Sequence, residues 1–134
     1  MEEIYEGDFV IIDDDPINNL ICSKFIKKVC PRSTVKTFTL PLDGVKFVLS
    51  YDSVDNIAKT ILLLDINMPA TSGWDVLDAF ASSIGFRQQQ YAIYMLSSSI
   101  AIEDRNRAKT HPLVSGFIEK PLTIASIHKL IAEQ

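Results

Sequence analysis

Five residues with chemically capable side chains follow short apolar runs in this 134-residue sequence. They are Asp13, Asp14, Asp65, Ser97 and Lys120. Three carboxylates brought close together would repel one another, and a divalent cation removes that cost. Hard carboxylate oxygens favour Mg²⁺ over zinc or copper, and Mg²⁺ often shares carboxylate and phosphate ligands. A lysine ammonium and a serine hydroxyl can contact the same phosphate oxygens. The set therefore predicts a phosphoryl-transfer site in which one carboxylate could be the nucleophile.

Short apolar runs alternate with helical patterns along the chain, and these elements must position the five side chains. Apolar or β-branched runs predict strands at 9–12, 33–39, 61–64, 91–96 and 115–118. Helices are predicted at 16–29, 42–49, 74–81, 100–109 and 124–131, the fourth of them polar. Asp15 and Pro16 supply an N-cap and a first-turn proline for the first helix.

Strands that alternate with helices imply parallel pairing and right-handed crossovers. We therefore predict an α/β fold, a three-layer α/β/α sandwich of the flavodoxin-like (βα)5 type, with a parallel five-stranded sheet of order 2-1-3-4-5. Ligands of such sheets bind beyond the carboxyl ends of the strands where the order reverses, here between the first and third strands. Asp13, Asp14 and Asp65 are expected to share one crevice there, with Ser97 and Lys120 on its far side.

The composition is that of one globular domain. Hydrophobic residues make up 47% and charged residues 22% of the chain, which excludes a disordered tail, a collagen-like repeat and a coiled coil. The net charge of −4 argues against a nucleic-acid binder. No apolar run approaches the roughly 20 residues of a membrane span, and the acidic N-terminus is unlike a basic signal peptide. We expect a single domain over residues 1–134, a cytoplasmic protein, and ordinary reduced thiols at Cys22 and Cys30.

Four motifs occur in order along the chain. They are Ile12-Asp13-Asp14-Asp15-Pro16, Leu64-Asp65-Ile66-Asn67-Met68-Pro69 followed by Gly73, Met95-Leu96-Ser97-Ser98, and Phe117-Ile118-Glu119-Lys120-Pro121. Over residues 8–132 the sequence resembles the receiver domain of bacterial two-component response regulators, in the stand-alone form without an output domain. The resemblance implies a phosphorelay signalling module and not an enzyme, beyond self-catalysed phosphorylation and dephosphorylation.

The resemblance also implies roles for individual residues. Asp65 would be the phosphoacceptor, supplied by a sensor histidine kinase or a histidine phosphotransfer protein. The ligands of Mg²⁺ would be Asp13, Asp14, Asp65 and the main-chain carbonyl of Asn67. Ser97 and Lys120 would contact the phosphoryl oxygens.

A conformational switch is implied as well. The hydroxyl of Ser97 would move toward the phosphoryl group, and the ring of Phe117 would turn inward. These movements would change the surface of the fourth helix, fifth strand and fifth helix, so that it docks on an effector protein or passes the phosphoryl group on. Neither nucleic acid nor a membrane is an expected partner.

Some positions carry further expectations. The Lys120-Pro121 bond is often cis in this family, and Ser72 stands where many relatives carry Asp. Asn67 and Ser99 occupy positions that tune the loss of the phosphoryl group in relatives. A basic cluster is expected to be a solvated face, or else part of a partner surface. It consists of Arg105, Arg107 and Lys109.

Other functions are weighed against this one. A phosphohydrolase of the haloacid-dehalogenase kind would use Asp13 as nucleophile and Asp15 as acid and base, but Pro16 and the missing cap domain argue against it. A flavodoxin would present amides to its phosphate, whereas the aspartates here would repel one. A receiver that never accepts phosphate is disfavoured by the intact set of aspartates with Lys120.

Overall fold

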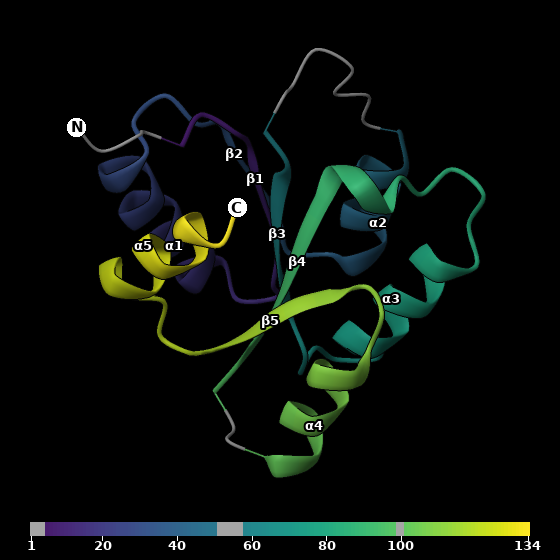
Figure 1. Cartoon of the computed structure of the whole chain (residues 1–134). Helices are drawn as coiled ribbons and strands as arrows, with labels where there is room; N and C mark the ends of the chain where they lie inside the picture. The colour runs from purple at the N-terminus through teal and green to yellow at the C-terminus, as the bar shows by residue number, and fades with distance from the viewer. Residues whose placement is uncertain (1–4, 51–57, 99–100) are drawn as a thin grey trace.

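Parallel strands build the sheet in the order that the sequence predicts. The computed structural model describes residues 5–50, 58–98 and 101–134. Within them, five parallel strands lie in the order β2-β1-β3-β4-β5 (Figure 1). The strands are β1 (Phe9–Ile12), β2 (Val35–Phe38), β3 (Thr60–Asp65), β4 (Tyr91–Ser97) and β5 (Val114–Glu119). The predicted fold class and strand order are confirmed.

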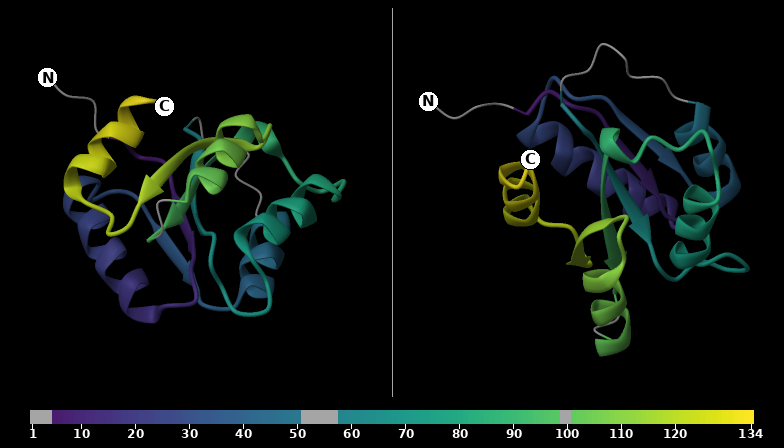
Figure 2. Two further views of the ribbon diagram at one scale, coloured as in Figure 1. Left: turned by 90° about the horizontal axis from the view of Figure 1, so that it is seen from below. Right: turned by 45° about the vertical axis from the view of Figure 1, so that its right-hand side comes forward.

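Helices cover both faces of this sheet. They are α1 (Pro16–Val29), α2 (Pro41–Ser50), α3 (Gly73–Ala81), α4 (Ile102–Thr110) and α5 (Ile124–Ala132). Helices α1 and α5 lie on one face, while α2, α3 and α4 lie on the other (Figures 1 and 2). No helix in the described part of the chain is both long and apolar enough to cross a membrane.

The central strands are buried on both faces, as their continuous apolar runs predict. Side chains that pack with α2 and α3 include Val10, Ile12, Leu62 and Leu64. Side chains that pack with α1 and α5 include Phe9, Ile11, Ile61 and Leu63. Because successive residues of a strand point to opposite faces, four-residue apolar runs supply two cores at once.

Helix α1 buries a different face from the one that its apolar residues indicate. Its buried side chains are Asn19, Cys22 and Ile26. Ile17 is 68% exposed, and Leu20 and Ile21 are also exposed. Asn19 can be buried because its Nδ2 donates to the main-chain oxygen of Asp13 at 2.9 Å, which removes much of the cost of burying an amide. Its Oδ1 atom is buried without a hydrogen-bond partner among the described residues. With Asn19 turned toward the core, the three apolar side chains lie at the surface.

Element ends differ from the predictions by a few residues. Strand β2 is shorter than 33–39 because Ser33 belongs to the preceding turn, where its N–H donates to the oxygen of Cys30. The predicted start of the fourth helix at residue 100 lies outside the described residues, as does Ser99. A 3-10 turn, η1 (Gln88–Gln90), was not predicted because a run of glutamines carries no hydrophobic period.

Candidate functional site

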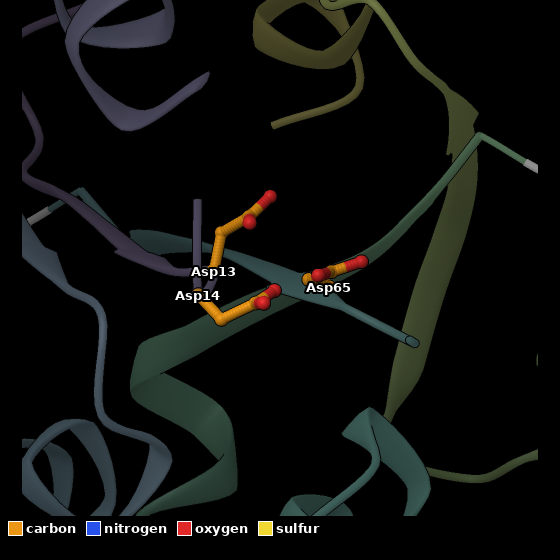
Figure 3. A group of neighbouring side chains, drawn as sticks. All are labelled: Asp13, Asp14 and Asp65. Atoms are coloured by element: carbon orange, nitrogen blue, oxygen red, sulfur yellow. The ribbon is translucent and has the colours of Figure 1, made fainter. Parts of the chain in front are cut away.

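The three aspartates meet beyond the carboxyl ends of β1 and β3. These strands pair with Ile12 opposite Leu64, so Asp13 and Asp65 follow in neighbouring positions. One carboxylate oxygen from each of Asp13, Asp14 and Asp65 lies within 4.8 Å of the others (Figure 3). Asp13 and Asp65 are buried, whereas Asp14 remains accessible to solvent. The predicted acidic crevice is thus present between the first and third strands.

Lys120 lies within this cluster and not merely on its far side. Its Nζ atom is 2.6 Å from Oδ2 of Asp13 and 3.2 Å from Oδ1 of Asp65. The main chain holds the lysine in place, because its N–H donates to the oxygen of Ser97 at 2.8 Å. The Lys120-Pro121 bond is cis, as the family resemblance implies. Lys120 therefore bridges two carboxylates that come from distant parts of the sequence.

Burial and charge shift the ionisation of these groups. Burial, followed by the charge of Asp13, raises the pKa of Asp65 to about 6 from an ordinary 3.8, against opposing contributions from Lys120 and the Asn67 N–H. Burial disfavours the charged form of Lys120, but hydrogen bonds and charges of Asp13 and Asp65 outweigh it and raise the lysine pKa. The site holds one ammonium and three carboxylates, so negative charge is in excess when all of them are ionised.

The geometry of the cluster fits a magnesium ion. Ligand atoms on opposite sides of an octahedral Mg²⁺ are about 4.2 Å apart, twice the Mg–O distance of about 2.1 Å. One oxygen from each aspartate lies within 4.8 Å of the others, a limit somewhat wider than that span, so a bound ion would require a small inward adjustment of these side chains. The accessible side at Asp14 leaves room for the waters that Mg²⁺ usually retains. The donor set, three carboxylates, is also of the hard oxygen type that Mg²⁺ prefers.

The loop after β3 is held close to the site. The N–H of Gly73 donates to the oxygen of Ile66 at 2.9 Å. A Cβ atom at Gly73 would lie 2.5 Å from the main-chain oxygen of Asp65, so only glycine permits this approach of α3 to the end of β3. Ser72 caps α3 in a reciprocal arrangement with Asp75, which gives this departure from the family pattern a structural role.

Asn67 connects the phosphoacceptor candidate to Ser97. Its N–H donates to Oδ1 of Asp65 at 3.3 Å, and its Nδ2 donates to the hydroxyl of Ser97 at 3.3 Å. Ser97 is fully buried at the end of β4. Phe117 is half-buried in β5, farther from the aspartates along the strand. The structure thus brings Asp65, Asn67, Ser97 and Lys120 together, with Phe117 on the neighbouring strand.

Two contacts of α4 were missed in the sequence. The guanidinium carbon of Arg105 lies 5.6 Å from the ring centre of Phe117, and that of Arg107 lies 4.5 Å from the ring of Trp74. Both arginines are exposed, as expected for a solvated face, yet each also makes a cation–π contact. Because α4 buries only Ala108, these ring contacts help to hold it against β5, through Phe117, and against α3, through Trp74. The positive charge of the two arginines in the sequence does not predict which aromatic rings they contact.

The asparagines of α1 were also missed. Asn18 donates from Nδ2 to Oδ2 of Asp13 at 2.8 Å, and Asn19 donates to the main-chain oxygen of Asp13. A usable signal was present in the sequence, because the first turn of a helix that starts at Pro16 must pass close to Asp13. Only the rotation of α1 about its axis, which tertiary packing sets, turns both amides toward it.

Comparison with known proteins places these observations in a family. The model of the response regulator receiver domain matches residues 9–132. A response regulator receiver protein from Dyadobacter fermentans is similar in structure, with a TM-score of 0.82, 24% identity, and coverage of 95% of this chain and 96% of that one.

A two component response regulator from Cytophaga hutchinsonii has a TM-score of 0.81 and 24% identity over 95% of each chain. The chemotaxis protein CheY4 of Vibrio cholerae has a TM-score of 0.73 and 16% identity over 96% of this chain and 98% of that one. None of the curated proteins compared with the chain matches it. Because the family model spans almost the whole chain and includes every strand end of the aspartate site, the chain belongs to the response regulator receiver domain family.

Proposed function

We propose that Asp65 accepts a phosphoryl group from the phosphohistidine of a sensor histidine kinase or a histidine phosphotransfer protein. The observation that carries this proposal is the contact of Lys120 with both Asp13 and Asp65 inside a cluster of three carboxylates. From this position the Lys120 ammonium can contact the negatively charged oxygens of a phosphoryl group bound to Asp65. The proposal makes the chain a phosphorelay module with Asp65 as its covalent intermediate.

In the transfer step the carboxylate of Asp65 attacks phosphorus, a new O–P bond forms, and the P–N bond to histidine breaks with its electron pair returning to the imidazole. Asp65 acts in its ionised form, which predominates above its pKa of about 6. Lys120 then moves from Oδ1 of Asp65 to a phosphoryl oxygen, and the Ser97 hydroxyl donates to another. Mg²⁺ bound by Asp13, Asp14, Asp65 and the Asn67 carbonyl would supply the neutralising charge.

A protein donor is supported by the exposed apolar side chains. Most of the large apolar residues exposed in the described part of the chain lie in segments that directly follow the carboxyl ends of strands, the end that carries Asp65. They are Ile17, Leu20, Ile21, Leu40, Leu42 and Ile102. Apolar side chains exposed at the end of the sheet that carries Asp65, here called the apolar rim, are available for contact with a partner protein. A small phosphodonor would need no such rim.

The output of the module is proposed at the surface of α4, β5 and α5. Phosphorylation would draw the Ser97 hydroxyl toward Asp65 and let the Phe117 ring turn inward, which changes this surface for docking of an effector protein or for onward transfer. The surface contains a cavity of about 340 Å³ between β5 and α5, whose lining includes Phe117, Glu119, Ser126 and Lys129. A cytoplasmic location stays a prediction from the sequence.

The phosphohydrolase alternative is not favoured. Its acid and base would be Asp15, but Oδ1 of Asp15 accepts the N–H groups of Ile17 and Asn18 at 2.9 and 3.3 Å. These are the hydrogen bonds of a helix N-cap, so the Asp15 carboxylate stabilises the start of α1 and is not free to act as a catalytic acid and base.

Labelling with acetyl phosphate tests the proposal. The purified chain is incubated with Mg²⁺ and acetyl phosphate, and intact mass spectrometry is expected to show one added phosphoryl group. Asp65→Asn should abolish the adduct, whereas Asp43→Asn, at an acidic residue in the first turn of α2, should retain it. The proposal fails if the wild type is unlabelled where a reference receiver labels, or if Asp65→Asn still carries the adduct.

A further inference from the structure

The buried carboxylate of Asp13 gathers hydrogen-bond donors from two separate parts of the fold. Its Oδ2 atom lies 2.6 Å from Nζ of Lys120 and 2.8 Å from Nδ2 of Asn18. Its Oδ1 atom accepts the N–H of Asp15 at 2.9 Å. Because an ionised carboxylate can only accept hydrogen bonds, the Asn18 amide must present its nitrogen. Lys120 and Asn18 therefore share one oxygen of Asp13.

The main chain of Asp13 is held from the same helix. Asn19 Nδ2 donates to the carbonyl oxygen of Asp13 at 2.9 Å, in a buried position. Asp15 caps α1 and so fixes the turn that carries both asparagines. Adjacent amides of α1 thus orient Asp13 at its carboxylate and at its backbone, independently of Lys120.

We propose that Asn18 is a positioning residue, which keeps the Asp13 carboxylate hydrogen-bonded and oriented when Lys120 moves to a phosphoryl oxygen on Asp65. The inference rests on the proposed function, because an incoming phosphoryl group is what draws Lys120 away. Without Asn18, Oδ2 of Asp13 would have Lys120 as its donor and would hold the ammonium back. Loss of the Asn18 amide should therefore slow phosphorylation.

A merely structural role for Asn18 makes a different prediction. Asn18 lies in the first turn of α1, where a carboxylate is favoured by the helix dipole. If Asn18 only supported the helix, Asn18→Asp would be neutral or stabilising. If Asn18 holds Asp13, the same change places two carboxylates 2.8 Å apart and must destabilise the fold.

The test compares Asn18→Ala and Asn18→Asp with a matched control, Ile17→Asp. The control adds the same charge one residue earlier, on a side chain that is 68% exposed. Urea unfolding in EDTA at pH 7.5 is expected to give Asn18→Asp the lowest midpoint of the three. With Mg²⁺ and acetyl phosphate, Asn18→Ala should label about tenfold more slowly than the wild type, the factor for one lost hydrogen bond to a charged group.

A double-mutant cycle adds a readout that a structural role would not move. Asn18→Ala should lower the urea midpoint further in a Lys120→Met background than in the wild type, because Oδ2 of Asp13 then loses both donors. If the effects of Asn18→Ala and Lys120→Met on the urea midpoint are additive, the inference is overturned. This cycle tests the role of Asn18 even if the Asn18→Asp variant does not fold.

The outcomes separate the inference from the proposed function. An unlabelled wild type contradicts phosphoacceptance itself. A wild type that labels normally, with both Asn18 variants within twofold of its rate and Asn18→Asp as stable as Ile17→Asp, leaves phosphoacceptance standing and removes the role of Asn18.

Discussion

Replacing Asp65 by Asn should stabilise the fold in the absence of magnesium. Burial and the charge of Asp13 raise the pKa of Asp65 to about 6, compared with 3.8 for an ordinary aspartate. The folded state therefore binds a proton more tightly than the unfolded state, and ionised Asp65 costs stability at neutral pH. An amide of the same shape removes this cost and can still accept hydrogen bonds from Lys120 and the Asn67 N–H.

The magnitude follows from the two pKa values. Their difference, at 1.36 kcal/mol for each pH unit, corresponds to about 3 kcal/mol. This figure already includes the attraction of the Lys120 ammonium, which is 3.2 Å from Oδ1, for the ionised carboxylate. Because an amide does not reproduce every contact of the neutral acid, we expect a net gain of about 1–3 kcal/mol at pH 7.5. Because the folded-state pKa is the higher one, the gain is nearly complete above about pH 7, shrinks as the pH falls from about 6 toward 3.8, and is reduced to about a fifth near pH 4.

Urea unfolding in EDTA, followed by circular dichroism at several pH values between 4 and 7.5, measures this gain. Asp43→Asn is the control, since none of the ion pairs found among the described residues includes Asp43, and it should change the free energy of unfolding by less than about 0.5 kcal/mol. A destabilised Asp65→Asn protein at pH 7.5 would refute the reasoning. A gain that does not depend on pH would equally refute it, because the effect would then not arise from the ionisation of Asp65.

Three further predictions use other parts of the molecule. Adding Mg²⁺ at ten times its dissociation constant should raise the free energy of unfolding of the wild type by about 1.4 kcal/mol, measured by urea unfolding, and a wild type without this shift would contradict the metal site. Leu20→Glu should reduce phosphotransfer from a histidine kinase at least about tenfold, while labelling by acetyl phosphate stays within twofold of the wild type. The control is Ile84→Glu, because the exposed Ile84 side chain follows α3 at the other end of the sheet. An equal loss of phosphotransfer in both variants would exclude the apolar rim as the contact surface for the kinase. Gly73→Ala should lower the free energy of unfolding by about 2 kcal/mol or more, because the new Cβ atom would lie 2.5 Å from the Asp65 oxygen; an unchanged urea midpoint would show that α3 can move away.

Much of the fold could be predicted because its signals are local. Continuous apolar runs identified the buried strands, and the alternation with helices implied parallel pairing, which the strand order confirms. The N-cap at Asp15 was correct for the same reason, since a helix start depends on a few neighbouring residues. The exposure of Ile17, Leu20 and Ile21 could not be read from the apolar spacing of α1, because it depends on a contact made only in the folded chain, that of the buried Asn19 amide with the main-chain oxygen of Asp13.

The sequence by itself determined which chemical groups stand at the carboxyl ends of the strands, because each strand is a short local pattern with a polar residue at its end. In a parallel sheet those ends share one edge, so the crevice of Asp13, Asp14 and Asp65 followed from topology. Only the tertiary structure decided that Lys120 contacts two of these carboxylates and that Asn18 shares an oxygen of Asp13 with it. Those contacts depend on how far β5 extends and how α1 is turned, and such placements arise from the packing of the whole core and not from spacing along the chain.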